Sequence, residues 1–362
     1  MNIYIVTFAN GNYGSLLQAY ALQSRLREFG AAPCLLLESN PKRRSKLHSI
    51  WRIIKPQRHY TLFQRVQRKI QSEDFKGKKD KMTQFFNKNL SVSVITDKRA
   101  FVQNLSSEDV FIAGSDQIWN ILNKPLSKWY SLQWVDNRCR KYSYAASIGL
   151  STLTEQQKRE YTFGLSAFRV LSFRETDAVN ALSSCFSGNI RQDIDPTLLY
   201  DACFWRKIEA PQLVEHPYIF VYMLRPNMEV INMARSIAKV KGCKIIFTGQ
   251  FADRFEGTTT VCDAGVEEFL SYIDHAQAVV TNSFHGTVFS ILFEKPFLSV
   301  RVSSTGSRAE SLLKLLNLEA QLVENVHDSF SLEINYSPVK SILANEREKS
   351  LDYLRSICAF KV

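Results

Sequence analysis

The stretch IYIVTFANGNYGSLLQAYALQSRLREFG, residues 3–30, decides the fold class of this chain. It opens with a continuous apolar run, which is typical of a strand buried on both faces of a parallel sheet. The segment from Gly11 to Gly14 interrupts that run, and a helix is expected from about Ser15 to a C-cap at Gly30. Apolar residues recur through this helix at spacings of three and four: Ala19, Leu22, Leu26 and Phe29. A strand, a loop and a helix in this order predict an α/β domain.

The same alternation continues to the end of the chain. Further strands are expected at CLLL, DVFIAG, KYSYAAS and RVLSF, and then at YIFVYML, CKIIFTG, AVVTN and FLSVRV. Helices are expected near residues 154–168, 176–182, 228–241, 266–276, 285–294 and 307–316. We therefore predict an N-terminal domain at 1–205, a C-terminal domain at 206–335, and a last helix within 336–362 that packs back on the first domain. Two parallel sheets would form a cleft between their strand carboxyl ends, where open α/β sheets bind ligands.

Composition sets limits on location and on cofactors. The 362 residues are 45% hydrophobic and 22% charged, as in ordinary globular proteins. No apolar run approaches the roughly 20 residues of a membrane helix, and the first residues do not resemble a signal peptide. We expect a cytoplasmic protein, or one peripheral at the inner face of the membrane. The seven cysteines form no CxxC pair and the six histidines show no ligand spacing, so no metal is expected.

The positive charge is concentrated in one segment. Residues 42–81 hold fourteen Lys or Arg against three Asp or Glu, so their local net charge of +11 equals that of the whole chain. Within the segment, TLFQRVQRKI can form a helix with one apolar and one basic face. Three interpretations remain open: a solvated surface insertion, a patch for anionic lipid or a lipid-linked phosphate, and a nucleic-acid patch. No nucleic-acid motif supports the last, and we expect no nucleic-acid partner.

Candidate site residues lie on the loops that follow expected strands. Asn12, Tyr13 and Gly14 can approach a ligand at a helix N-terminus, or can form a tight turn capped by Ser15. Neither GxGxxG nor a Walker sequence occurs. Asp116 can bind a sugar hydroxyl, act as a base or cap a helix at IWN.

The remaining candidates are equally open at this level. Arg174 can bind a carboxylate or phosphate, or pair with Glu175 or Asp177. His285, in TNSFHG, can move a proton or bind an anion, or can simply bond to backbone. Arg301 and Arg308 flank a polar loop and can reach the cleft.

Six motifs in order resemble the polysaccharide pyruvyl transferase family. They are NYGSLLQAYALQ at 12–23, GSDQIWN at 114–120, SYAASIG at 143–149, SFRE at 172–175, DPTLL at 195–199 and TNSFHGTVFSILFEKPF at 281–297. The resemblance implies two Rossmann-like domains with parallel sheets facing a cleft, in a GT-B-like arrangement. It implies transfer of a pyruvyl group from phosphoenolpyruvate to two hydroxyls of one sugar, which forms a ketal and releases phosphate. The implied setting is synthesis of a capsule, an exopolysaccharide or a lipid-linked glycan precursor.

The resemblance also implies roles for individual residues. His285 matches the donor-site histidine that assists proton transfer or phosphate departure, and Arg174 matches an arginine that binds the donor. Family members can carry an arginine two residues before this histidine, where this chain has Ser283. We expect Arg308 or Arg301 to supply that charge, and Asp116 to orient or deprotonate the acceptor. Substrate contacts are also expected from loop residues: Ser283, Asn12, Tyr13, Gly14, Ser115, Gln117 and Ser147.

Two other functions remain alternatives. A GT-B glycosyltransferase would use a nucleotide-sugar donor in place of phosphoenolpyruvate, and a non-catalytic binding protein would use the basic segment alone. Phosphoenolpyruvate is expected as a donor substrate, and no cofactor is expected.

Overall fold

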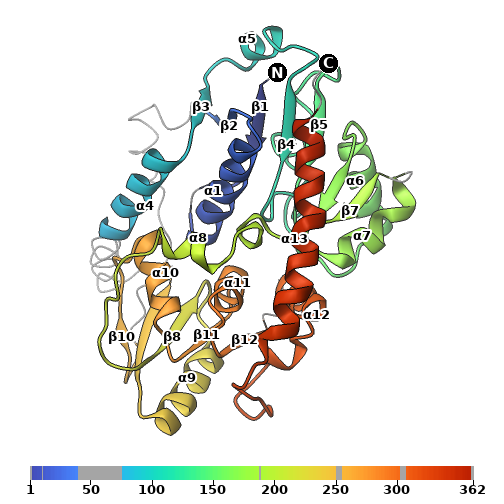
Figure 1. Cartoon of the computed structure of the whole chain (residues 1–362). Helices are drawn as coiled ribbons and strands as arrows, with labels where there is room; N and C mark the ends of the chain where they lie inside the picture. Colours follow the sequence, from blue (N-terminus) through green and yellow to red (C-terminus); the bar gives the residue numbers. More distant parts are fainter. Residues whose placement is uncertain are drawn as a thin grey trace, which may run out of the picture.

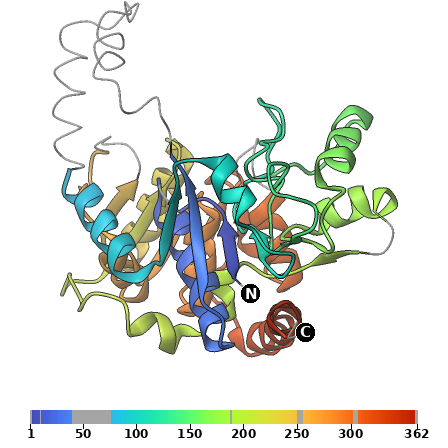
Figure 2. The same cartoon turned by 90° about the horizontal axis from the view of Figure 1, so that it is seen from above.

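The computed structural model describes residues 2–9, 11–39, 76–186, 189–249, 255–301 and 307–359. Most of the basic segment at 42–81, including the predicted amphipathic helix TLFQRVQRKI, lies outside these residues. Two α/β domains make up the described chain, one above the other in Figure 1 and seen from above in Figure 2. Among the described residues, no helix is long and apolar enough to cross a membrane.

The first domain is built on a five-stranded parallel sheet in the order β3-β2-β1-β4-β5. Its strands are β1 (Ile3–Val6), β2 (Pro33–Glu38), β3 (Val92–Ile95), β4 (Val110–Ala113) and β5 (Arg140–Ser143). A parallel pair, β6 (Leu171–Phe173) and β7 (Ile190–Gln192), continues beside β5 through isolated bridges. The helices of this domain are α1 (Tyr13–Glu28), α4 (Lys76–Asn89), α5 (Lys98–Gln103), α6 (Glu155–Leu165) and α7 (Thr176–Leu182). Short 3-10 turns follow at η2 (Ser183–Cys185) and η3 (Pro196–Leu199).

Helix α1 begins two residues earlier than the spacing of its apolar residues predicts. Asn12 is its N-cap, and the Asn12 side chain accepts a hydrogen bond from the Ser15 amide at 2.8 Å. An Asn cap of this kind satisfies an amide that the helix itself leaves without a partner. At the other end Phe29 is the C-cap, and Gly30 follows it with φ +80°. The predicted glycine therefore ends the helix one position beyond the cap.

The second domain has a six-stranded parallel sheet in the order β10-β9-β8-β11-β12-β13. Its strands are β8 (Tyr218–Met223), β9 (Lys244–Gly249), β10 (Thr259–Thr260), β11 (Ala278–Thr281), β12 (Phe297–Val300) and β13 (Leu322–Val323). Its helices are α9 (Met228–Lys241), α10 (Val266–Asp274), α11 (Phe284–Leu292), α12 (Ser307–Leu315) and the turn η4 (Glu319–Gln321). The fold class of two Rossmann-like α/β domains with parallel sheets is confirmed.

The last helix, α13 (Tyr336–Cys358), runs from the second domain back along the first (Figure 1). The Tyr353 hydroxyl donates to the Ser143 carbonyl at 2.8 Å, and Arg347 Nε donates to the Leu198 carbonyl at 2.9 Å. At the other end of the helix the Tyr336 hydroxyl donates to the Lys295 carbonyl of the second domain at 2.6 Å, so the final helix joins the two domains along one side.

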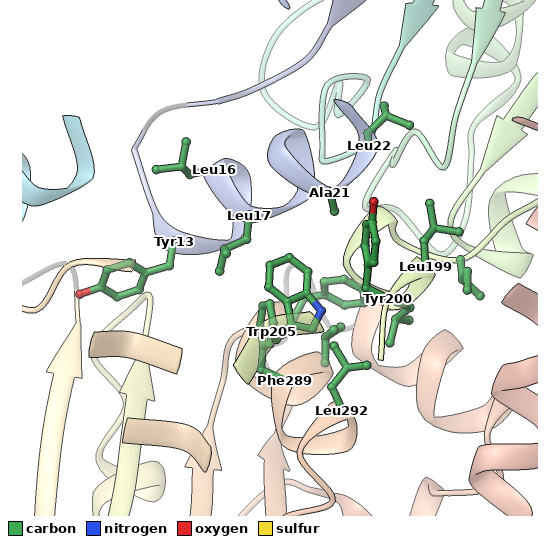
Figure 3. Close-up of a cluster of buried hydrophobic side chains, with 14 of the residues drawn as sticks. Tyr13, Leu16, Leu17, Ala21, Leu22, Leu199, Tyr200, Trp205, Phe289 and Leu292 are labelled. Atoms are coloured by element: carbon green, nitrogen blue, oxygen red, sulfur yellow. The ribbon is translucent and has the colours of Figure 1, made fainter. Parts of the chain in front are cut away.

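The domains share a hydrophobic core. Short helix α8 (Ala202–Arg206) places Trp205 between α1 and α11, where its indole meets the Phe289 ring edge-on at 5.1 Å (Figure 3). Leu17 and Ala21 of α1 are fully buried in the same cluster. Because large apolar surfaces meet here, the contact between domains resembles a domain core more than a mobile hinge.

The carboxyl ends of both sheets meet at this junction. In the first sheet the order of the strands reverses between β1 and β4, and in the second it reverses between β8 and β11. Open α/β sheets bind ligands at such switch points. The two switch points, one in each sheet, are therefore the places to look for function.

Candidate functional site

His285 lies in the first turn of α11, directly after the switch-point strand β11. Ser283 is the N-cap, and its Oγ accepts from the Gly286 amide at 3.4 Å. Only glycine fits at position 286, because a Cβ there would lie 2.3 Å from Thr281 Oγ1. The cap and this close approach fix the start of the helix, so the His285 side chain, 5% exposed, has a defined place at the domain junction.

The first domain meets His285 through Gly14. A Cβ at Gly14 would lie 1.9 Å from His285 Nδ1, so only glycine fits against the imidazole. Beside it, the Tyr13 hydroxyl donates to the Ala264 carbonyl at 2.6 Å, and its ring stacks on Phe269 at 4.4 Å. Asn12, Tyr13 and Gly14 thus form the start of α1 and a contact between the domains. That they also bind substrate stays a prediction.

A buried carboxylate, Asp195, organises the residues around His285. Its Oδ2 lies 2.6 Å from Arg174 Nη1 and 3.5 Å from His285 Nε2. Ser115 Oγ lies 3.4 Å from the same oxygen, while Thr197 Oγ1 donates to Oδ1 at 2.7 Å. The partner of Arg174 is therefore Asp195, from the DPTLL motif, and not Glu175 or Asp177, the partners considered from sequence. A pair 21 residues apart gives no local signal in the sequence.

Asp195 is an ionised group despite its burial. Burial alone would raise its pKa, but the opposing effects of His285, Arg174 and the Thr197 hydroxyl hold the pKa of Asp195 below its usual range. An ionised carboxylate that contacts both His285 and Arg174 keeps these two side chains oriented. Of the Arg174 nitrogens, Asp195 accepts a hydrogen bond from Nη1 alone, so Nε and Nη2 of the guanidinium have no partner among the described residues.

Several side-chain nitrogen atoms of this cluster are buried without a hydrogen-bond partner among the described residues. They are Arg174 Nε and Nη2, Arg308 Nε and His285 Nε2. The 3.5 Å contact of His285 with Asp195 is an ion-pair distance rather than a hydrogen bond. A buried donor without a partner costs about 1–3 kcal/mol, and native structures keep few of them. Three such nitrogens belong to guanidinium groups, which are always donors, so within the described residues this cluster has hydrogen-bonding capacity left for acceptor oxygens.

Arg308, near the start of α12, faces the same crevice as Arg174. Both guanidinium groups lie against the Phe284 ring, at 4.2 Å for Arg174 and 5.8 Å for Arg308. Burial and the nearby Arg174 lower the pKa of Arg308 to about 10, against the opposing effect of Asp116, Glu175 and Asp195. Arg308 therefore remains a cation at neutral pH. The crevice between these residues is narrow and is also lined by Gln192 and Leu312.

Arg301 has a different environment. Its side chain is exposed and pairs with Glu310 at 3.1 Å and with Glu324 at 3.2 Å. Ser283, where the family can have an arginine, is buried and caps α11. Of the two arginines considered from sequence, the structure places Arg308 in the cluster and leaves Arg301 in exposed ion pairs.

On the side of the first domain, the GSDQ loop is not a helix start. Asp116 has φ +69° and is 7% exposed, and its Oδ1 accepts from the Gln117 amide at 2.7 Å. The IWN segment is not helical, so the alternative of Asp116 as a helix cap is wrong. The Ser115 hydroxyl donates to the Ala145 carbonyl at 2.8 Å. Gln117 Nε2 is buried without a partner among the described residues.

Glu175 is a further buried group that sequence reasoning treated only as a possible ion-pair partner. It is fully buried and accepts a hydrogen bond from the Ser147 hydroxyl. Burial raises the pKa of Glu175, against the opposing effects of Arg174, Ser147 and Arg308. Ser147, predicted to contact substrate, therefore bonds to this carboxyl group. Its substrate contact stays a prediction.

A family model described as polysaccharide pyruvyl transferase matches residues 12–304 of the chain. The chain belongs to this family. The matched range contains every residue of the His285 cluster except Arg308, which lies four residues beyond it. Members of this family are transferases, so the predicted enzyme class is confirmed. A search of curated proteins found no match.

Solved structures similar to the pyruvyl transferase show the fold. UDP-GlcNAc 2-epimerase from Methanocaldococcus jannaschii is 10% identical with a TM-score of 0.51, over 97% of this chain and 93% of that one. Arabidopsis thaliana UGT89C1 complexed with UDP-L-rhamnose is 10% identical with a TM-score of 0.51, over 99% of each chain. Both likenesses extend over the whole molecule, in agreement with the predicted GT-B-like arrangement. At this identity they carry the fold alone.

The site of the pyruvyl transferase can bind an anion and move a proton. Arg174 and Arg308 line one crevice, and the buried carboxylate of Asp195, which also lines it, contacts both Arg174 and His285. Among the described residues, no group of three His, Cys, Asp or Glu side chains lies together as a metal site would require. The chemistry that the described side chains themselves offer is acid–base catalysis with electrostatic stabilisation of an anion.

Proposed function

We propose that the enzyme transfers a pyruvyl group from phosphoenolpyruvate to two hydroxyls of one sugar, forming a ketal and releasing phosphate. The observation that carries this proposal is a set of buried nitrogen atoms without a partner among the described residues: Arg174 and Arg308 at one crevice, and His285 beside Asp195. Phosphoenolpyruvate carries a carboxylate and a phosphate on adjacent groups, so it offers several acceptor oxygens within a small volume. Arginine is the side chain best suited to bind both groups.

The reaction has an addition and a displacement. In the addition, the methylene carbon of the donor takes a proton from an acid while a sugar oxygen bonds to the neighbouring carbon and loses its own proton to a base. In the displacement, the second hydroxyl bonds to the same carbon as the carbon–oxygen bond to phosphate breaks, and its proton leaves with the released phosphate. His285 assists proton transfer or phosphate departure, Asp195 holds it in place, and Arg174 and Arg308 bind the charges of the donor. Asp116, across the junction, orients or deprotonates the acceptor.

The acceptor is proposed to be an oligosaccharide or a lipid-linked glycan of a capsule or exopolysaccharide pathway, on the cytoplasmic side of the membrane. No cofactor and no nucleic acid take part in this proposal. Peripheral membrane contact through residues 42–81 stays a prediction, because most of that segment lies outside the described residues.

The test compares His285→Ala with His275→Ala. His275 serves as a matched control because it is the C-cap of α10, bonded to the Ser271 carbonyl, and is outside the cluster. We expect phosphate release from phosphoenolpyruvate, assayed with a panel of glycan acceptors, to fall by about 100-fold or more in His285→Ala. The control should keep its rate.

Thermal shift measurements distinguish the alternative function. Phosphoenolpyruvate should stabilise the wild-type enzyme, while UDP-sugars and GDP-sugars should not. Stabilisation by a nucleotide sugar and not by phosphoenolpyruvate would instead support a glycosyltransferase.

A further inference from the structure

Three sequence motifs lie side by side at the carboxyl ends of β4, β5 and β6. They are GSDQIWN at 114–120, SYAASIG at 143–149 and SFRE at 172–175. Parallel bridges join Ala146 of the middle motif to Asp116 on one side and to Phe173 on the other. The middle motif therefore connects the Asp116 loop with the segment that carries Arg174.

Ser147 of the middle motif holds the Asp116 loop through its backbone. The Ser147 amide donates to the Asp116 carbonyl at 2.9 Å, and the Ser147 carbonyl accepts from the Trp119 amide at 3.3 Å. Asp116 has φ +69°, a conformation that a residue other than glycine keeps only where the surrounding structure imposes it. The place of the Asp116 carboxylate thus depends on where Ser147 lies.

The Ser147 side chain is held in turn by Glu175. Ser147 Oγ donates to Glu175 Oε1, and both residues are fully buried. Glu175 is the N-cap residue of α7 but makes no side-chain cap bond. At this helix start the Thr176 amide donates instead to Ser311 Oγ of α12, at 3.1 Å. The Glu175 carboxyl group thus serves the bond with Ser147 rather than the helix.

Two tasks can be distinguished for this carboxyl group. Its oxygen can fix Ser147, or its charge can balance nearby cations. Burial raises the pKa of Glu175, and the charges of Arg174 and Arg308 oppose that rise. Arg174, however, takes Asp195 as its ion-pair partner at 2.6 Å. The direct contact of the Glu175 carboxyl group is the hydrogen bond with Ser147, which favours the first task.

We propose that Glu175 and Ser147 are positioning residues that hold Asp116 where it acts on the acceptor. The inference rests on the proposed function, in which Asp116 orients or deprotonates the acceptor. Glu175 follows Arg174 directly in the chain, so the pair also fixes the place of Asp116 relative to a donor-binding arginine. A shift of about 1 Å between the parts of a site is enough to slow a reaction strongly. Ser147 performs this task without touching substrate.

Hydrogen exchange of the full chain, followed by mass spectrometry over residues 114–120, tests the positioning without the reaction. Ser147→Ala and Glu175→Ala each remove one partner of the bond, whereas Glu175→Gln keeps an oxygen that can accept from Ser147. Ser271→Ala is the matched control, because Ser271 is a buried serine of α10 whose hydroxyl donates to the Pro211 carbonyl. We expect exchange over 114–120 to rise about tenfold in the two alanine variants of the pair, as the loss of one hydrogen bond predicts. Glu175→Gln and the control should stay within about twofold of the wild type.

Phosphate release from phosphoenolpyruvate, assayed with the same panel of glycan acceptors, measures the consequence for the reaction. The kcat is referred to the number of phosphoenolpyruvate-binding sites counted by calorimetric titration, so that a loss of folded enzyme does not lower it. Ser147→Ala should lower this kcat by about tenfold and leave the KM for phosphoenolpyruvate unchanged, because the donor-binding arginines are intact. Glu175→Gln should keep kcat within about threefold of the wild type.

Unchanged exchange over 114–120 in Ser147→Ala would overturn the positioning role. A larger fall of kcat in Glu175→Gln than in Ser147→Ala would overturn it as well, because the charge of Glu175 would then matter more than its bond to Ser147. Absence of phosphate release from phosphoenolpyruvate in the wild type would instead remove the proposed function, and hydrogen exchange would still show whether the pair holds the loop.

Discussion

The two switch points of this molecule have equivalent places in their sheets and different side chains. After β11 comes His285, which lies beside an ionised Asp195; that carboxylate pairs with Arg174, and Arg174 shares a crevice with Arg308. After β1 and β4 come Phe8, whose ring meets the Tyr130 ring at 4.8 Å, and one carboxylate, Asp116. Equivalent places in two related folds thus differ in charge.

This difference shows how one cleft can bind two unlike substrates. The two arginines come from different domains, Arg174 from the first and Arg308 from the second, and both lie against the Phe284 ring. Two cations at one place suit a doubly charged donor of the kind proposed above. Substitutions of Gly14 at the contact between the domains, of Arg308 and Arg301, and of Lys78 test this difference.

The largest effect is expected from Gly14→Ala, where helix α1 of the first domain meets the His285 ring of the second. The new methyl group would overlap the His285 ring, so either the imidazole or the start of α1 must move. We expect a loss of activity of about 100-fold, because misplacement of a catalytic group by about 1 Å has that effect. Unfolding free energy should fall by about 1–3 kcal/mol, as for an overpacked core. Phosphate release and chemical denaturation would measure the two.

A double mutant shows whether the His285 ring is the cause. In an His285→Ala background the methyl group has room, so the stability cost of Gly14→Ala should largely disappear. An equal cost in both backgrounds would mean that Gly14 acts through the backbone of α1 and that the contact with His285 is incidental.

The second prediction compares Arg308 with Arg301, either of which the sequence analysis allowed as a donor-binding residue. Arg308→Gln should raise the KM for phosphoenolpyruvate by about tenfold or more, because a charge-assisted hydrogen bond contributes about 1.5–3 kcal/mol. Arg301→Gln should leave that KM unchanged, since Arg301 is exposed and pairs with Glu310 and Glu324. Equal effects of the two substitutions would contradict the assignment of Arg308 to the donor site.

These cases show how far the sequence predicts the molecule. The fold class follows from periodicity, and α7 and α9 have the predicted bounds. Candidate residues were found because loops after parallel strands face a cleft. Asp195 was missed, because its contacts with Arg174 and His285 join segments that are distant in the sequence.

The smallest effect is expected at Lys78, a buried cation of α4 that lies at the contact between the two domains. This residue of α4 donates to the Gly249 carbonyl at 2.8 Å, and its Nζ lies 4.2 Å from the Tyr13 ring centre. It therefore joins α4, at the end of the basic segment, to the second domain. Burial lowers the pKa of Lys78 to about 8.

A lysine whose pKa is lowered by folding destabilises the folded state at any pH at which that lysine is still protonated in the unfolded chain. The cost is largest at low pH, where the folded protein must also keep the proton. As pH rises from about 8 toward the ordinary lysine value, the folded state loses its proton first, and this cost declines. Relative to Lys78→Met, the wild-type unfolding free energy should therefore increase by about 1–2 kcal/mol between pH 8 and pH 9.5. Denaturation at a series of pH values measures the difference, in which the titration of other groups cancels. If the unfolding free energies of the two proteins instead depend on pH in the same way, Lys78 is as well solvated as a surface lysine, and its proposed burial between α4 and the second domain is wrong.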